Sequence, residues 1–221
     1  MGIVAMQIDT PLFPLPLRCQ ITSIPHRTLT SRFTLHSASA RLRHMKFLAA
    51  LVLPLYALDQ ATKAWIFTHY ALRLPENMEH LFPEVQAQTA HLPPAWEVVP
   101  DFFTIIHAAN TGAAFSMGTG KNGLFIFISL VALVALLVGW QRRAFTDRPS
   151  RWAVALLISG ILGNVTDRLL HGYVVDFLSF DLHVPYAHPF ATFNVADACI
   201  CTAAGLFILA ALLEGRGKKS A

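Results

Sequence analysis

The chain has 221 residues, of which 54% are hydrophobic and 14% charged, and its mean hydropathy is +0.49. Soluble domains carry about 25% charged residues, so this composition excludes a typical cytosolic enzyme and an intrinsically disordered chain. The cysteines Cys19, Cys199 and Cys201 form neither a disulfide framework nor a paired zinc-binding motif. The composition indicates an integral membrane protein with one compact domain.

The formal net charge of +4 is carried by residues 1–44, which contain five arginines and one acidic residue. A segment rich in Arg and Ser and poor in acids is either an organelle transit peptide or an extension from a start assigned too early. Met45-Lys46-Phe47 has the pattern of a membrane-protein start. We interpret residues 1–44 as an N-terminal extension outside the fold, and residues 45–221 as a single integral membrane domain.

Four apolar segments have a length that suits transmembrane helices. The first is interrupted by Asp59, Gln60 and Lys63, and the third is short, although Val165 and Leu169–Leu170 extend its apolar pattern. The segments cover about Phe47–Tyr70, Gly123–Trp140, Trp152–Gly163 and Asn194–Leu213. Four such helices place both termini on the same side of the membrane.

Basic residues identify that side. They follow the second and fourth apolar segments: Arg142, Arg143, Arg148, Arg151, Arg216, Lys218 and Lys219. By the positive-inside rule these loops and both termini are cytoplasmic. The connecting segments on the other side are predominantly acidic, and we expect the polar groups of the domain to gather on that outer side.

The outer segments contain strand patterns. Aromatic and β-branched residues dominate WEVVPDFFTIIH (96–107), with Pro100 as a break, and YVVDFLSFDL (173–182). We expect short strands here, forming a small sheet on the outer membrane surface. Residues 76–94 have no clear period and are predicted to be an irregular insertion. The expected fold is therefore an all-α membrane protein with four transmembrane helices and a small extracytoplasmic, β-rich substrate cradle.

Ionisable residues inside or beside the apolar segments are costly in hydrocarbon and persist only with partners or in a hydrated cavity. There are six of them: Asp59, Lys63, Asp167, Arg168, Asp176 and Asp197. All six fall toward the outer half in the expected topology. This clustering on one side indicates a site that faces outward.

Several of these residues have structural explanations. Asp59 and Lys63 are spaced i, i+4, which predicts an intrahelical ion pair with a structural role. The functional alternative is that the pair also lines the site. Asn194 with Asp197 has the pattern of a helix N-terminal cap, and Asn164 with Asp167 has the same spacing. Asp167-Arg168 fits a self-neutralised helix terminus whose arginine reaches the membrane interface.

Asp176 is harder to explain structurally, because apolar residues flank it on both sides. If Asp197 lies beside it, two carboxylates share one apolar-walled site, and one of them retains a proton. Such a pair deprotonates a water molecule with one carboxylate and protonates a carbonyl oxygen with the other. This is the chemistry of aspartic proteases, which needs neither metal nor cofactor.

Other chemistries fit less well. Cys199 and Cys201 are two residues apart on a helix, and His183 and His188 lack a metal-binding spacing, so we expect no metal site and no cofactor. Phosphate-binding glycine motifs are absent from the sequence, and the basic loops are explained by topology, so we expect no nucleotide or nucleic-acid partner.

The ordered motifs resemble those of the lipoprotein signal peptidases, the bacterial signal peptidase II family. In chain order they are DQATK (59–63), NTGAAFS (110–116), GNVTDR (163–168), VVDF (174–177) and FNVAD (193–197). The resemblance extends from about Met45 to Leu213. The N-terminal extension and the long 76–94 segment depart from the family pattern.

The resemblance implies an intramembrane aspartic endopeptidase of the bacterial inner membrane that cleaves diacylglyceryl-modified prolipoproteins just before the lipidated Cys. It implies that Asp176 and Asp197 form the catalytic pair and that the cyclic peptide globomycin blocks them. The supporting residues it implies are Asp59, Lys63, Asn110, Gly112, Asn164, Asp167, Arg168 and Asn194. The expected partners are lipid-modified prolipoproteins and membrane lipids, with the enzyme a monomer.

Two other functions share some of these features. A small proton-coupled transporter also carries intramembrane Asp, Lys and Arg, but here the charges cluster on one side, and no inverted repeat is evident. A non-catalytic assembly or chaperone protein would use the aspartates only as caps and ion pairs. Loss of cleavage on replacing either Asp176 or Asp197 distinguishes the peptidase from both.

Overall fold

The computed structural model describes residues 26–74, 80–112, 121–184 and 191–217, with side chains described between residues 43 and 214. The chain divides into two compact units, Met1–Arg43 and His44–Ala221. Helix α1, His26–His69, contains residues of both. The features that follow belong to the second unit.

Three further long helices form the body of this unit: α3, Asn122–Gln141, α4, Arg148–Leu170, and α5, Val195–Gly217. They confirm the predicted apolar segments. Helix α4 continues to Leu170, beyond the strictly apolar stretch, because its C-terminal polar residues are buried within the fold rather than exposed. It begins at a well-formed cap, in which the backbone N–H of Ser150 donates to the Asp147 carboxylate at 2.7 Å.

Within the described residues, α3, α4 and α5 are long and apolar enough to cross a membrane. Helix α1 is not among them, because Asp59, Gln60 and Lys63 lower the hydropathy of its C-terminal half. The three spanning helices differ in burial: 67% of the apolar window of α4 is buried, against 6% for α3. Helix α4 is therefore the central helix, and α3 presents most of its surface outward.

Helix α4 packs closely on α5 through small residues. A Cβ added at Gly160 would lie 2.5 Å from the carbonyl oxygen of Ala196 and 2.6 Å from Ile200. A Cβ added at Gly163 would overlap the Asp59 carboxylate and reach 3.0 Å from the Ala196 methyl group. Small residues at such contacts allow helix backbones to approach one another. At the far end, Leu48 and Trp140 pack against the N-terminal half of α4.

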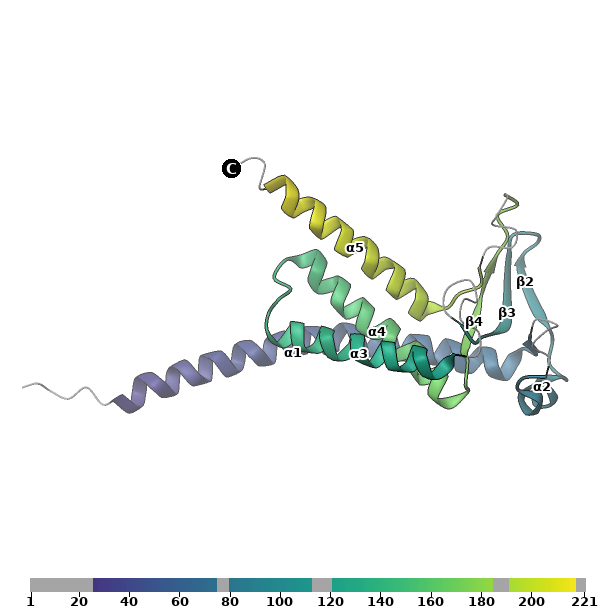
Figure 1. Ribbon diagram of the computed structural model, residues 1–221, viewed down its shortest axis with the longest axis horizontal. Helices are drawn as coiled ribbons and strands as arrows, with labels where there is room; N and C mark the ends of the chain where they lie inside the picture. Colours follow the sequence, from purple (N-terminus) through teal and green to yellow (C-terminus); the bar gives the residue numbers. More distant parts are fainter. Residues whose placement is uncertain (1–25, 75–79, 113–120, 185–190, 218–221) are drawn as a thin grey trace, which may run out of the picture. The chain divides into compact units, whose positions relative to one another are not determined.

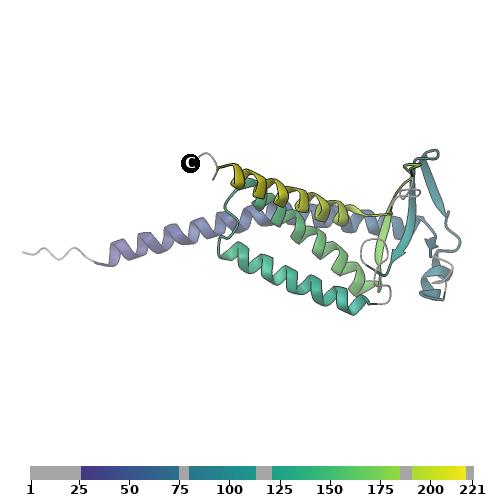
Figure 2. The ribbon, with the colours of Figure 1, turned by 45° about the horizontal axis from the view of Figure 1, so that its top comes forward.

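A four-stranded sheet lies beyond one end of α3, α4 and α5 (Figures 1 and 2). The strands are β1, Leu72–Arg73, β2, Ala95–Val99, β3, Phe103–Asn110, and β4, Val174–Phe180. Strand β3 is central: it pairs antiparallel with β4 along one edge, and with β2 (antiparallel) and β1 (parallel) along the other. The predicted strands are confirmed, and Pro100 lies in the turn that joins β2 to β3.

The expectation of an irregular segment over residues 76–94 is wrong in part, because helix α2, Pro83–Thr89, lies within it. Pro83 suits the first turn of a helix. The helix is held by contacts distant in sequence: the backbone N–H of Leu72 donates to the Thr89 hydroxyl at 3.0 Å, and Phe82 and Val85 pack against Tyr173 and its apolar neighbours. A seven-residue helix stabilised in this way leaves no periodic signal. Residues 75–79 lie outside the described part.

Gly160→Ala should destabilise the protein, because the added methyl group has no space between α4 and α5. Overpacking of this kind costs ~1–3 kcal/mol, which a lower thermal unfolding temperature in detergent would show. Gly205→Ala on α5 is the matched control, since nothing lies within 4 Å of its added Cβ. Equal melting temperatures for the two variants would contradict the close packing.

Candidate active site

Asp176 lies on β4 with 2% of its surface exposed. Two asparagines donate to its carboxylate: Asn110 Nδ2 to Oδ2 at 2.9 Å, and Asn194 Nδ2 to Oδ1 at 2.7 Å. Burial, and next the negative charge of Asp197, raise the pKa of Asp176 to about 7, although both asparagine bonds oppose this shift. The Asp176 carboxyl is thus able to hold a proton near neutral pH.

Asp197 lies in the first turn of α5. The predicted cap is confirmed: the backbone N–H of Asp197 donates to Asn194 Oδ1 at 2.9 Å, and that of Asn194 donates to Asp197 Oδ2 at 3.4 Å. Asp197 also accepts a bond from Asn164 Nδ2 at 2.7 Å. The cap therefore serves to hold a carboxylate whose remaining surface faces a cavity.

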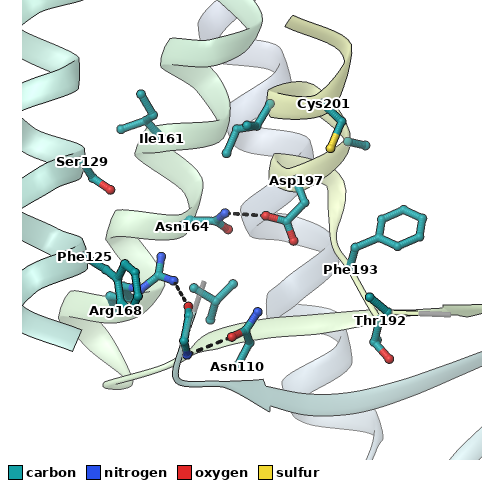
Figure 3. A pocket seen from close by; sticks show the side chains of 15 residues that line it. Asn110, Phe125, Ser129, Ile161, Asn164, Arg168, Thr192, Phe193, Asp197 and Cys201 are labelled. Carbon is teal, nitrogen blue, oxygen red and sulfur yellow. Dashed lines mark hydrogen bonds between the residues drawn. The ribbon is translucent and has the colours of Figure 1, made fainter. Parts of the chain in front are cut away.

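Two asparagine side chains connect the two carboxylates. Asn194 Nδ2 donates to Asp176 and also to Asn164 Oδ1, at 3.2 Å, while Asn164 Nδ2 donates to Asp197 (Figure 3 shows the bond between Asn164 and Asp197). Asp176 and Asp197 are thus the two ends of one continuous hydrogen-bonded chain. The chain joins two buried carboxyl groups in one polar network, and the charge of Asp197 acts on Asp176.

A buried ion triad lies next to this chain. Lys63 Nζ is 2.9 Å from Asp59 Oδ2, 2.9 Å from Asp167 Oδ2 and 3.1 Å from Asn164 Oδ1. All three charged side chains are at most 3% exposed. The predicted pair of Asp59 with Lys63 is confirmed, and Asp167 is a second partner that the sequence did not predict. Charges buried this deeply require such pairing.

The two triad carboxylates also hold the backbone beside the site. Asp59 Oδ1 accepts the N–H of Ala196 at 2.8 Å, and Asp167 Oδ2 accepts the N–H of Val175 at 3.0 Å. Ala196 immediately precedes Asp197, and Val175 immediately precedes Asp176. Each triad carboxylate is therefore bonded to the backbone N–H of the residue that precedes one of these two aspartates. These bonds explain why Asp59 of α1 and Asp167 of α4 are buried at this position in the fold.

Gln60 also belongs to this network, although the sequence analysis assigned it no role in the site. Its Nε2 lies 3.2 Å from Asp59 Oδ2, 3.1 Å from Asp167 Oδ1 and 3.3 Å from the carbonyl oxygen of Gly163. The side chain thus links α1 to α4 beside the triad. The signal that was available is its position next to Asp59 in a segment otherwise suited to a membrane.

The expectation that Arg168 neutralises Asp167 and reaches the membrane interface is wrong. Asp167 is paired with Lys63, and Arg168 is 9% exposed. The guanidinium donates from Nη2 to the carbonyl oxygen of Gly112 at 2.7 Å and lies over the Phe125 ring (Figure 3). Gly112 in turn donates its N–H to Asn110 Oδ1 at 3.0 Å. Residues 113–116 of the same motif lie outside the described part.

A cavity of about 510 Å³ opens beside Asp197 (Figure 3). Its polar lining includes Asn110, Asn164, Arg168 and Asp197, and most of the rest is apolar, contributed by α3, α4, α5, β4 and the residues just before α5. Asp176 is not a lining residue and lies behind Asn110, to which it is bonded. No group of three or more potential metal ligands occurs among the described residues.

Comparisons with known proteins agree with this geometry. The family model of signal peptidase (SPase) II matches residues 51–213. The chain belongs to the signal peptidase II family. The lipoprotein signal peptidase of Psychromonas ingrahamii is 38% identical over 78% of this chain and 86% of its own length. That of Photorhabdus laumondii is 41% identical over 58% of this chain and 76% of its own length.

A solved bacterial membrane enzyme, determined by the in meso method at 2.3 Å, is 27% identical with a TM-score of 0.60. The match covers 78% of this chain and 91% of that enzyme. This signal peptidase is thus an aspartic peptidase with a membrane-enzyme fold. The range that the family model matches, residues 51–213, contains the ion triad and both Asp176 and Asp197.

Lys63→Met should strongly destabilise this signal peptidase, because it leaves two buried carboxylates without their cation. Breaking a buried ion pair costs ~3–5 kcal/mol, so we expect a large loss of yield and of melting temperature. Lys46→Met removes an exposed lysine from the same helix and is the control. Normal yield for Lys63→Met would show that the triad does not support the fold.

Proposed function

We propose that the chain removes signal peptides from diacylglyceryl-modified prolipoproteins, cleaving just before the lipidated Cys, with Asp176 and Asp197 as the catalytic pair. The observation that supports this most directly is the hydrogen-bonded chain from Asp176 through Asn194 and Asn164 to Asp197. It links Asp197, which lines a largely apolar cavity, to Asp176, which lies behind Asn110. The relatives named lipoprotein signal peptidase support the substrate class.

In the proposed reaction, the ionised member of the pair takes a proton from a water molecule, whose oxygen attacks the scissile carbonyl carbon. The other member donates its proton to the carbonyl oxygen, giving a neutral gem-diol. Collapse of this intermediate breaks the C–N bond and protonates the leaving amine, and the pair again holds one proton. The raised pKa of Asp176 suits the shared-proton state, because burial and the charge of Asp197 both disfavour double ionisation.

The neighbouring residues orient this pair. Asn110 and Asn194 hold Asp176, and Asn164 holds Asp197. Arg168 holds the backbone at Gly112, which follows Asn110 along one wall of the cavity. The amide donors orient both carboxylates without adding charge. Burial and the charge of Asp197 outweigh the two asparagine bonds in raising the pKa of Asp176.

The proposed setting is the bacterial inner membrane, with α1 as a fourth span, both termini cytoplasmic, and the pair near the periplasmic face. Basic residues between α3 and α4 support this orientation. The apolar cavity walls suit the diacylglyceryl chains and an apolar signal helix that arrives laterally from the lipid. The sheet then forms a cradle whose outer strands hold the extended residues around the scissile bond by edge pairing. The enzyme acts as a monomer, and globomycin competes for the same cavity.

Asp176→Asn and Asp197→Asn should each abolish cleavage of a purified lipid-modified prolipoprotein, since each removes one half of the acid–base pair. The rate should fall at least ~10³-fold while melting temperature and substrate binding are retained. Asp101→Asn, an exposed aspartate in the turn before β3, is the control and should cleave normally. A near-normal rate for either variant of the pair would contradict its catalytic role.

The pH dependence of kcat/KM should show an alkaline limb near the pKa of Asp176, about 7, because the last shared proton is lost there. Asn110→Ala removes a hydrogen bond that stabilises the carboxylate. The pKa of Asp176 then rises, and the limb should move to higher pH by ~1 unit. Asn122→Ala is the control. The Asn122 side-chain amide donates to the backbone carbonyl oxygen of Arg168 and not to Asp176, so this variant should leave the alkaline limb in place. A shift of the Asn110 variant to lower pH would contradict the assignment.

A further inference from the structure

Strand β3 contains one more residue than β4 just before the site. The pairs Phe103↔Phe180 and Ile105↔Leu178 share one register, whereas Ala108↔Asp176 and Asn110↔Val174 follow a register shifted by one. Between these two stretches β3 holds Ile106 and His107, while β4 holds Phe177 alone. This is a β-bulge, a feature that bends a strand, re-aims its side chains and is frequent next to active sites.

The bulge decides which face of the sheet carries Asn110. In the observed register Ala108 is opposite Asp176, so Asn110, two residues further, points to the same face and is a diagonal neighbour of Asp176. Without the extra residue, His107 would be opposite Asp176 and Asn110 would point to the other face. The bond from Asn110 to Asp176 at 2.9 Å therefore exists only because of this one-residue insertion.

His107 is fully buried and bonded on both ring nitrogens. Nδ1 is 3.2 Å from the carbonyl oxygen of Tyr70, and Nε2 is 3.2 Å from the hydroxyl of Tyr173. A carbonyl oxygen only accepts, so we assign the proton to Nδ1, and Nε2 then accepts from Tyr173. Burial lowers the pKa of His107 to about 4 and raises that of Tyr173, which keeps both groups neutral.

The same contacts fix the bulge from both strands. His107 is the residue of β3 that pairs with Leu72 of β1, and Tyr173 directly precedes β4. The apolar cluster beside Tyr70 and Tyr173 packs against Val175 and Phe177, on the face of β4 opposite to Asp176. The bond between His107 and Tyr173 thus holds the inserted residue at one position, on the face away from the site.

We propose that His107 and Tyr173 are positioning residues for cleavage: their hydrogen bond fixes the bulge ahead of the Ala108–Asp176 pair and thereby places Asn110 on Asp176. The inference rests on the proposed catalytic role of Asp176. If the bulge moved past Asn110, His107 would be opposite Asp176, Ala108 would be opposite Val175, and Asn110 would point to the other face. The hydrogen bond between His107 and Tyr173 opposes this shift, because moving His107 would leave its Nε2 atom and the Tyr173 hydroxyl buried without a hydrogen-bond partner.

Cross-linking tests the register without reference to activity. In the full chain with Cys19, Cys199 and Cys201 replaced by Ala, the pair Ala109→Cys with Val175→Cys reports the observed register, and Ala108→Cys with Val175→Cys reports the alternative. Opposed strand positions lie within disulfide reach. Adding Tyr173→Phe should lower disulfide yield in the first pair and raise it in the second. An unchanged pattern overturns the proposal.

Kinetics tests the positioning role. Tyr173→Phe should lower kcat by ~10-fold with KM nearly unchanged, and should have little further effect in an Asn110→Ala background, because both changes break the same chain of contacts. Tyr56→Phe removes another tyrosine hydroxyl bond, to Thr166, and should lower stability but not kcat. If the losses in kcat of Tyr173→Phe and Asn110→Ala add up in the double variant, Tyr173 does not act through Asn110 and the proposal is overturned. A shifted cross-linking pattern with unchanged kcat would instead contradict the catalytic role of Asp176.

Discussion

The architecture depends on one buried cation, the ammonium group of Lys63. Moving it and two carboxylates out of water costs several kcal/mol per ion, which their mutual attraction offsets only with good geometry and further hydrogen bonds. Both conditions are met, since Asp59 and Asp167 are each 2.9 Å from Lys63 and each accepts a backbone N–H. The accepted N–H groups belong to the residues before Asp197 and Asp176. The ion triad around Lys63 thus holds the beginning of α5 and the beginning of β4, which are distant in the sequence, next to each other.

The second constraint is steric. Helices α4 and α5 approach closely at Gly160 and Gly163, and this brings Ala196 within reach of Asp59. A larger residue at either glycine would separate the helices and leave the Asp59 carboxylate without that bond. The close contact of α4 with α5 and the buried charges therefore lie at the same position along the helices. The polar chain of Asn164 and Asn194 extends from this level to the sheet, where β4 supplies Asp176.

Features that depend on residues close together in the sequence could be predicted, and features that depend on residues far apart in the sequence could not. Apolar segments, alternating strands, the i, i+4 pair of Asp59 with Lys63 and the cap of Asn194 are local patterns, and they were found. The contact of Lys63 with Asn164 joins residues 101 apart, so no local pattern records it. The partner of Arg168 was predicted wrongly for the same reason: its neighbour Asp167 is bonded elsewhere. Helix α2 and the bulge at His107 arise from tertiary contacts and leave no periodic signal.

The cavity walls have a kinetic consequence. They are largely apolar and are contributed by α3, α4, α5, β4 and the residues just before α5. Only 6% of the apolar window of α3 is buried. In the proposed reaction the substrate enters this cavity from the lipid and stays in the hydrocarbon phase throughout turnover, so enzyme and substrate collide in two dimensions. The quantity that governs the rate is then the mole fraction of substrate in lipid or detergent, rather than its molarity in the sample. Adding detergent lowers the mole fraction of enzyme and substrate in the micelles. This slows the reaction even when the molar concentrations of enzyme and substrate in the sample are unchanged.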